Sequence, residues 1–243
     1  MKILVCISVV PDTTTKITFT DNNTTFNKAG VQFIVNPYDE LAVTRALELA
    51  EANNGNVTIV HVGEADSEPC IRKALSMGAN EAIRINANPV DAQFVAEEIA
   101  KIAQGYDLIL TGRESIDYNG GAVCGLLGAL LNIPSINVVT KIEYNGGNFT
   151  FDRDIDGGKE ILTCTGPLVA SAQKDLCEPR IPNMRGIMAA RTKPLQIIEA
   201  SVSNQAANYQ SYSLPAAKGS VKLIDAENAG ELINILKNEV KVI

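Results

Sequence analysis

The chain has 243 residues and a formal net charge of -7, and 46% of its residues are hydrophobic. This length suits one domain with an appendage, or two small domains, and the apolar fraction is enough for a sizeable core. The negative charge argues against nucleic acid as a partner, because binding to phosphates requires clustered Lys and Arg. The basic patch between Arg180 and Lys193 is too short to reverse that balance.

Cysteine and histidine are few and scattered. The five cysteines form no C-x-x-C pair and His61 is the single histidine, so the sequence predicts neither a metal centre nor a disulfide framework. We interpret His61 as a buried structural histidine, since no acid or nucleophile stands near it in sequence. Pro11 cuts the apolar N-terminal run short, which is typical of a strand and not of a signal peptide. No apolar run reaches the roughly 20 residues of a membrane helix, and we expect a cytoplasmic protein.

Short apolar runs alternate with amphipathic helical patterns from the N-terminus to about residue 139. The runs predicted as strands are residues 3–9, 57–62, 82–85, 108–111 and 136–139. Strands that are apolar throughout are usually covered on both faces, which requires parallel pairing with helices between them. The sequence therefore predicts an α/β fold with a three-layer parallel sheet.

Two N-P-x-D tetrapeptides, at residues 36–39 and 88–91, predict helix starts. In the first, Asn36 stands at the N-cap and Pro37 at the first helical position, with an acidic residue three positions past the cap. The second predicts the same start for a helix that ends before Gly105. A shorter helix is predicted to end at Gly78.

Three turn sequences predict antiparallel ribbons: D-N-N at 21–23, N-G-G at 145–147 and D-G-G at 156–158. The strands expected beside these turns are residues 16–20, 24–27, 141–144, 148–151, 152–156 and 161–165. We expect the last pair to form a two-stranded flap. Residues 168–172 read as a buried strand, and the prolines after it lead the chain out of the core.

The C-terminal third carries two further helical patterns. Met184, Ile187 and Met188 lie at helical spacing beside Arg185, a combination of flexible apolar and basic side chains that suits changing partners. The pattern is loose over 205–215, and a helix is then predicted over 226–239. Its apolar side chains either dock on a partner or pack on their own domain, and the sequence leaves both open.

The stretch T-G-R-E-S-I-D-Y-N-G-G-A-V-C-G at residues 111–125 is the strongest local candidate for chemistry. It follows a predicted strand and opens a helix, so Gly120 and Gly121 fall near a helix N-terminus, where free N–H groups favour an anion. It is neither G-x-G-x-x-G nor a Walker A loop. The alternative is a tight turn with close helix packing.

The order of motifs resembles the β subunits of electron-transfer flavoproteins, the FixA family. The R-x-x-D-G-G hairpin at 153–158 precedes a strand that opens with P-x-V at 167–169, and a docking loop follows at about 180–194. The resemblance extends from V-P-D-T at 10–13 through the first N-P-Y-D to Pro194. It implies an adenine-nucleotide-binding fold of the universal-stress-like (HUP) type, with added hairpins and a C-terminal arm.

The resemblance also implies a nucleotide pocket. Similar proteins carry G-[KR]-Q-x-I-D-x-D-x-x-Q-x-G at 112–124, and this chain departs from that pattern at Glu114, Asn119, Ala122 and Cys124. These departures remove polar groups that would contact the nucleotide, so AMP or FAD remain open as its occupant. The cofactor-binding residues carried over are Cys6, Asn36, Asp39, Val62, Gly112, Asp117, Asn119, Gly120, Gly121, Ala122, Val123 and Cys124.

The family resemblance gives the chain a role in electron carriage without a redox group of its own, because the sequence lacks a metal-cluster, haem or dithiol motif. FAD would be carried by an α subunit in a heterodimer. Electrons would come from flavin dehydrogenases such as acyl-CoA dehydrogenase and pass to a quinone oxidoreductase. The partner-docking residues implied are Met184, Arg185, Ile187 and Met188. AMP would be structural, whereas in bifurcating members a second FAD occupies the pocket and oxidises NADH.

The chain is accordingly divided into a nucleotide-binding domain at 1–178, a docking loop at 179–194 and an α-subunit-binding arm at 195–243. One rival interpretation is a free-standing universal-stress-like nucleotide-binding protein, which has no use for the docking loop. Another is an ATP-pyrophosphatase, which should show S-G-G-x-D-S after its first strand. Residues 8–12 read S-V-V-P-D instead.

Overall fold

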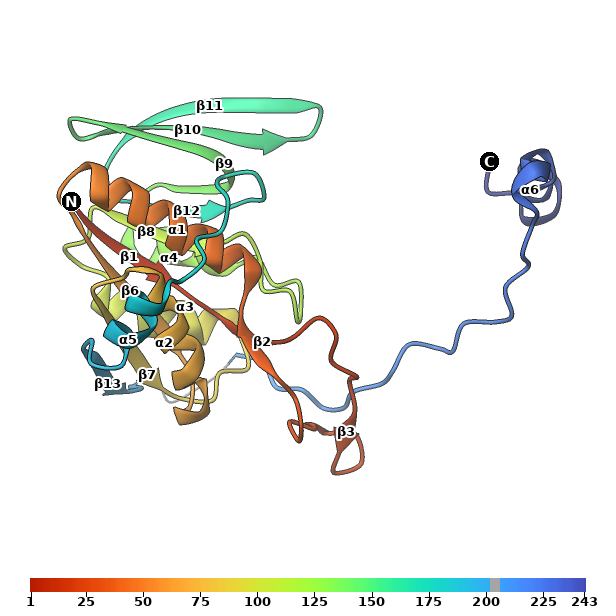
Figure 1. Cartoon of the computed structure of the whole chain (residues 1–243), viewed down its shortest axis with the longest axis horizontal. Coiled ribbons are helices and arrows are strands. Elements are labelled where there is room, and N and C mark those ends of the chain that lie inside the picture. The colour runs from red at the N-terminus through yellow and green to blue at the C-terminus, as the bar shows by residue number, and fades with distance from the viewer. Residues whose placement is uncertain (202–205) are drawn as a thin grey trace.

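One large sheet organises the chain, of which a computed structural model describes residues 1–201 and 206–243. Within these residues nine strands pair in the order β11-β10-β9-β12-β8-β1-β6-β7-β13 (Figure 1). The strands that pair in parallel are β1 (Lys2–Cys6), β6 (Asn56–Val62), β7 (Glu81–Asn86), β8 (Leu108–Gly112), β9 (Ser135–Asn145), β12 (Leu168–Ala172) and β13 (Leu195–Glu199). Two antiparallel strands, β10 (Asn148–Ile155) and β11 (Gly158–Thr165), complete one edge.

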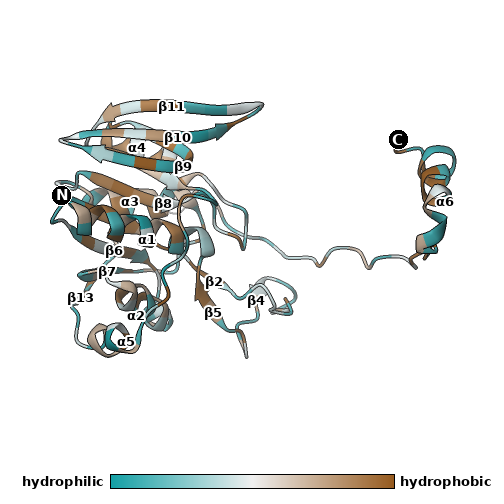
Figure 2. Ribbon diagram, turned by 45° about the horizontal axis from the view of Figure 1, so that its top comes forward, coloured by the Kyte–Doolittle hydropathy of each residue, from teal (hydrophilic) through white to brown (hydrophobic). Residues whose placement is uncertain are grey.

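Helices cover both faces of this sheet. The two apolar cores lie on opposite sides of β1, because alternate residues of a strand face opposite ways: Val5 belongs to one core and Leu4 to the other. The first core includes α1 (Pro37–Ala52), α2 (Glu68–Met77) and the end of α5 (Met184–Ala190), and the second includes α3 (Ala92–Ile102) and α4 (Val123–Leu131). Figure 2 shows hydrophobic residues concentrated along the central strands. The predicted three-layer α/β fold is confirmed.

The predicted strand over 3–9 is too long. β1 ends at Cys6, and Val9 starts a separate strand, β2 (Val9–Pro11), which pairs with β5 (Phe33–Val35) outside the main sheet. The small hairpin predicted around 21–23 is confirmed as β3 (Phe19–Thr20) and β4 (Thr25–Phe26). Each of its turn residues has a positive φ, which Asn and Asp tolerate better than most residues.

The two N-P-x-D tetrapeptides begin their helices differently. α1 starts at Pro37 as predicted, but the side chain of Asn36 makes no cap hydrogen bond. α3 starts only at Ala92, and its N-cap is Asp91, which accepts from the N–H of Phe94 at 2.7 Å. The predicted start at Asn88 is wrong, because the carboxylate that can reach the free N–H groups of the first turn stands three residues later.

The antiparallel hairpins predicted at the N-G-G and D-G-G turns are confirmed as β9–β10 and β10–β11, but the second does not form a flap separate from the sheet. β9, β10 and β11 continue the main sheet, because β9 pairs with β12 along its first half and with β10 along its second. The register shifts within both pairings. Val138, which lies on β9 at the shift in the pairing with β12, has a φ of 62°. Phe149 and Phe151 of β10 are almost completely buried, so this ribbon contributes to the core.

The sequence patterns did not predict β13, which pairs in parallel with β7 at the other edge of the sheet. Residues 195–199 therefore belong to the sheet and not to the C-terminal arm, which corrects the boundary predicted at 195. Three of its five residues are exposed, so the apolar alternation that marks a strand is weak.

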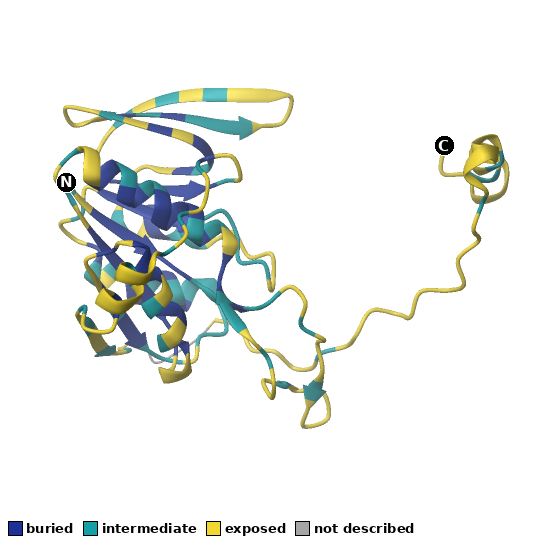
Figure 3. Cartoon of the chain, in the orientation of Figure 1, coloured by how far each residue is buried: buried dark blue, intermediate teal, exposed yellow. Residues whose placement is uncertain are grey.

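The arm leads away from the sheet to a helical segment (Figure 1). The loosely patterned stretch begins at Gln205, which lies outside the described residues. The helix predicted over 226–239 is confirmed as η2 (Ala226–Asn228), α6 (Ala229–Asn234) and η3 (Ile235–Val240). Leu232, Ile233 and Val240 are exposed, so this segment does not pack on its own sheet (Figure 3). None of the described helices has the length and apolar character that a membrane span requires.

Candidate functional site

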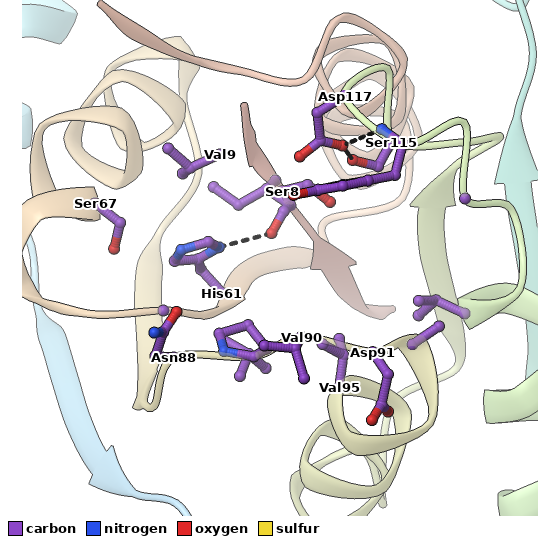
Figure 4. A pocket seen from close by; sticks show the side chains of 18 of the residues that line it. Ser8, Val9, His61, Ser67, Asn88, Val90, Asp91, Val95, Ser115 and Asp117 are labelled. Atoms are coloured by element: carbon purple, nitrogen blue, oxygen red, sulfur yellow. Dashed lines mark hydrogen bonds between the residues drawn. The ribbon is translucent and has the colours of Figure 1, made fainter. Parts of the chain in front are cut away.

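The order of strands reverses at β1. The chain proceeds from β1 to β6 and β7 on one side, and then returns to place β8 and β12 on the other. Ligands bind beyond the carboxyl ends of the strands at such a switch point. A cavity of about 760 Å³ lies there. Figure 4 shows side chains from strand ends, the 111–125 loop and α3 turned toward a common space.

Asp39 joins the two strands at the switch point. It accepts a hydrogen bond from the N–H of Ser8 at 2.6 Å and from the N–H of Gly112 at 2.8 Å. These groups follow β1 and end β8, so one buried carboxyl group from the first turn of α1 satisfies both. Burial raises the pKa of Asp39 to about 7, although the hydrogen bonds from Ser8 and Gly112 oppose this shift.

Gly112 has no room for a side chain. A Cβ atom there would lie 2.1 Å from Oδ1 of Asp39 and 2.9 Å from Cβ of Tyr38. The N-terminus of α1 therefore packs directly against the backbone at the end of β8. This close approach is what makes glycine necessary here, because its φ is not in the left-handed region.

Asn36 shapes the loop after β8. Its Nδ2 donates to the carbonyl of Glu114 at 2.8 Å, and its Oδ1 accepts from the N–H of Ile116 at 3.3 Å. The side chain is completely buried and does not line the cavity. The signal for this role was present in the N-P-Y-D motif, but the sequence could not show which distant loop the amide would bind.

The loop between β8 and α4 forms part of the cavity wall. It closes on itself where the N–H of Ser115 donates to the carbonyl of Gly120 at 3.0 Å. α4 then begins with Ala122 at its N-cap position, and this residue has no side chain that could cap the helix. Gly120, Gly121 and Val123 line the cavity, so the first turn of α4, whose N–H groups have no partner within the helix, lies beside it.

The charged side chains in the wall are largely paired with one another. Lys28 lies 3.4 Å from Asp66 and 3.7 Å from Glu64, and Nε of Arg113 lies 3.6 Å from Glu114. These exposed pairs are weak, but they place carboxylates beside both cations. These side chains therefore offer little unpaired positive charge to a ligand.

Two cysteines form part of the apolar wall. Cys6 ends β1 and Cys124 lies in the first turn of α4, and both are buried. Burial raises the pKa of the Cys6 thiol far above its usual range and that of Cys124 to about 12. Both thiols stay protonated at neutral pH and act as apolar surface, beside Val62 of β6.

His61 is buried, as predicted, but it lies in the cavity wall. Its Nδ1 lies 2.9 Å from the carbonyl oxygen of Ile7 and must therefore carry the proton (Figure 4). Burial lowers the pKa of His61. A Cβ atom at Gly63 would lie 2.1 Å from Nε2 of this imidazole, so the ring occupies the space over Gly63.

Most of the predicted cofactor-binding residues line this cavity. Those that do not are Asn36, Asn119 and Ala122, which lie in or beneath the adjoining loop. Asn119 reaches only Glu114, at 3.4 Å, and does not cap α4. Lining residues that the sequence analysis did not predict include Val95, Ile99, Tyr118, Tyr209 and Tyr212. The spacing of these tyrosines carries no recognisable pattern that would have indicated their convergence.

The predicted docking residues lie at the opposite end of α2. Ser67, just before α2, lines the cavity, whereas α5 packs near Ser76 at the other end of that helix. Met184 is 74% exposed, and Ile187 and Met188 are also exposed. The helical spacing predicted for them is confirmed. The cavity and this apolar surface are therefore separated by the length of α2.

The segment that carries α5 is anchored at both ends. Arg180 forms two hydrogen bonds with Glu51, at 2.7 and 2.9 Å, and its N–H donates to Thr44 at 2.9 Å. At the other end, Nζ of Lys193 donates to the carbonyl of Leu75 at 3.0 Å. Two residues predicted as a basic patch are thus structural anchors, and the apolar side chains between them face outward.

No group of three or more metal-ligating side chains was found among the described residues, and all five cysteines are free thiols. A family model described as the electron transfer flavoprotein domain matches residues 23–203. The electron transfer flavoprotein subunit beta of Bacillus subtilis (strain 168) is 37% identical over an alignment of 230 residues, and this alignment covers 88% of this chain and 90% of that protein.

The chain belongs to the β-subunit family of electron transfer flavoproteins. The subunit beta of Syntrophomonas wolfei is 34% identical and that of Bradyrhizobium diazoefficiens 30% identical, and both alignments cover all of this chain. The family resemblance predicted from the sequence motifs is confirmed. Membership in the electron transfer flavoprotein family supports a role in electron transport.

Proposed function

We propose that this chain is the β subunit of a heterodimeric electron transfer flavoprotein and binds an adenine nucleotide, most simply AMP, in a structural role. The observation that carries the proposal is the cavity at the switch point, with the uncapped first turn of α4 in its wall. FAD on the α subunit supplies the electron-carrying chemistry when it is bound. The β subunit holds that partner and presents the docking surface.

The residues of the cavity fit an adenine nucleotide. The N–H groups at the start of α4 would hold the phosphate, and Gly120 and Gly121 would let it approach the backbone. Apolar side chains such as Val62 and Val95 offer a surface for the base. Asp39 keeps the ends of β1 and β8 together. It would therefore fix the distance between the phosphate site at α4 and the apolar surface for the base.

The exposed apolar surface of α5, formed by Met184, Ile187 and Met188, supports a role in electron transfer to and from other proteins. Large flexible apolar side chains that stay exposed on an anchored helix are typical of protein interfaces. We place flavin dehydrogenases such as acyl-CoA dehydrogenase, and a quinone oxidoreductase as acceptor, at Met184, Arg185, Ile187 and Met188. The cytoplasm is the compartment we propose, because five free thiols suit a reducing environment.

A second candidate is FAD in the cavity, as in a bifurcating subunit that oxidises NADH. The cavity has a volume of about 760 Å³, which lies in the upper part of the usual range for ligand sites. This size favours the larger ligand, FAD. The lining includes residues of β1, β6, β8, α3 and the loop before α4, so a ligand longer than a mononucleotide has several elements to contact.

The experiment is to purify the heterodimer after co-expression, release its ligands and count them. One FAD and one AMP per heterodimer supports the carrier, and two FAD with no AMP supports the bifurcating subunit. A chain that purifies alone, without flavoprotein partner or adenylate, would contradict both.

A matched pair of variants at Gly120 tests the anion site directly. Nothing lies within 4 Å of a Cβ atom at Gly120, and its φ is not positive, so side chains fit there without strain. We expect Gly120→Asp to lose the nucleotide through repulsion of its phosphate, whereas Gly120→Ala should retain it. Equal nucleotide content in the two variants would rule out a phosphate at the start of α4.

A further inference from the structure

A segment that follows the sheet crosses the cavity. Residues 206–212, here named the strap, are the first described residues after the sheet domain and lead into the rest of the C-terminal arm. Asn208, Tyr209 and Tyr212 of the strap line the cavity, together with residues of the β3–β4 hairpin. Figure 1 shows the chain passing beside β3 before it leaves toward α6.

Four aromatic rings form a continuous stack through the strap. Phe19 of β3 stacks on Tyr212 with ring centroids 4.9 Å apart, and Tyr212 contacts Tyr209 at 5.5 Å. Tyr209 in turn stacks on Tyr118 of the 111–125 loop at 5.4 Å. The two ends of the stack therefore stand in the small hairpin and in the loop that opens α4, and both of these elements line the cavity.

Hydrogen bonds donated by backbone N–H groups fix the strap at both ends. The N–H of Ala207 donates to Oδ2 of Asp91, the N-cap of α3, at 3.1 Å. The N–H of Tyr212 donates to the carbonyl of Asn23, in the turn of the small hairpin, at 2.7 Å. The strap thus links α3, the hairpin and the 111–125 loop, which are separate in sequence and meet around the cavity.

We propose that the strap is the closing wall of the adenine-nucleotide site, and that its ring stack sets the rate at which the nucleotide leaves. This inference rests on the proposed nucleotide function. The ligand leaves when the stack between Tyr118 and Tyr209 opens. Because the strap continues into the arm, a partner that holds the arm also holds the nucleotide site closed.

The test is the exchange rate of AMP in the full chain, purified in complex with its flavoprotein partner. The complex is mixed with excess isotopically labelled AMP, and protein-bound nucleotide is followed by mass spectrometry. We expect Tyr209→Ala to exchange about tenfold faster than the wild type, because both of its ring contacts are lost. Tyr209→Phe keeps the ring and should exchange at the wild-type rate.

Two further variants separate the stack from other effects. Ser211→Ala changes an exposed strap residue outside the stack and should leave exchange unaltered. Since Tyr118 stacks on Tyr209, the double variant Y118A/Y209A should exchange no faster than Y209A. Wild-type exchange in Y209A, or equal acceleration by S211A, overturns the proposal. A wild-type complex without adenine nucleotide overturns the proposed nucleotide function, and this inference with it.

Discussion

The cavity and the proposed docking surface, which is formed by Met184, Ile187 and Met188 of α5, stand at opposite ends of α2 and are built in opposite ways. At the cavity, polar groups are buried and paired: Asp39 is 3% exposed and accepts from two strand ends. At α5, the polar residues Arg180 and Lys193 anchor the segment, and the apolar side chain of Met184 is 74% exposed. Substitutions at the cavity should therefore lower the free energy of unfolding, whereas substitutions on α5 should change partner binding.

The sharpest test of the cavity side is Gly112→Ala. Its Cβ atom would meet Oδ1 of Asp39 at 2.1 Å, which would push α1 away from β8. We expect the free energy of unfolding to fall by about 3 kcal/mol, measured by urea denaturation. Gly125→Ala is the control, since nothing lies within 4 Å of a Cβ atom there and helix propensity favours alanine. Equal stability of the two variants would mean that the contact between α1 and β8 is loose.

Asp39→Asn should have the next largest effect. An amide side chain has one oxygen that can accept, so either the N–H of Ser8 or that of Gly112 loses its partner. We expect a loss of about 2 kcal/mol in the free energy of unfolding at pH 8. An Asp39→Asn variant as stable as the wild type at that pH would show that the carboxylate does not join the two strands.

The same variant also tests how the stability of the folded chain depends on pH. The pKa of Asp39 is raised from 3.8 to about 7, so the folded chain binds an extra proton between these values. Its contribution to stability therefore falls as pH rises from about 4 to about 7. Urea denaturation across this range should show that fall in the wild type and not in Asp39→Asn.

Met184→Ala tests the docking surface. Because this side chain is exposed, we expect the free energy of unfolding to change by less than about 0.5 kcal/mol. Electron transfer from the flavin dehydrogenase should slow about tenfold in stopped-flow measurements, with flavin content unchanged. Leu130→Ala, an exposed apolar residue on α4, should leave transfer unaltered. Unchanged transfer in Met184→Ala would remove this residue from the docking role.

The smallest expected effect is spectroscopic and concerns His61, the single histidine. Its Nδ1 donates to the Ile7 carbonyl and burial lowers its pKa, so the imidazole should be neutral at neutral pH with the proton on Nδ1. NMR of the chain labelled with ¹⁵N-histidine reports this tautomer from one signal. A protonated ring, or a proton on Nε2, would contradict the geometry at the end of β1.

Local patterns predicted the elements well but not always their first residues. The N-P-Y-D motif at 36–39 begins α1 as expected, whereas N-P-V-D at 88–91 only precedes α3. The two tetrapeptides differ little in sequence. In the second, Asp91 serves as the cap, and in the first Asn36 turns away to bind the loop at Glu114. Helix starts depend on which acceptor reaches the free N–H groups, and competing tertiary partners decide that.

Features that depend on distant pairing were missed or misplaced. β13 has a weak apolar pattern and becomes a strand through its pairing with β7, some hundred residues earlier in sequence. The expected flap became part of the sheet because β9 continues from its parallel pairing with β12 into an antiparallel one with β10. The ring stack of the strap joins Phe19, Tyr118 and Tyr212 from three separate segments.

By itself, the sequence determined the α/β class, the glycine-containing loop before α4 and the apolar face of α5, because these follow from periodicity and turn chemistry within a few residues. Tertiary structure alone decided that Asp39 would join two strand ends, that Arg180 and Lys193 would anchor the segment that carries α5, and that tyrosines of the strap would line the cavity. These outcomes depend on which groups meet across the fold, and burial then fixes what each of them can do.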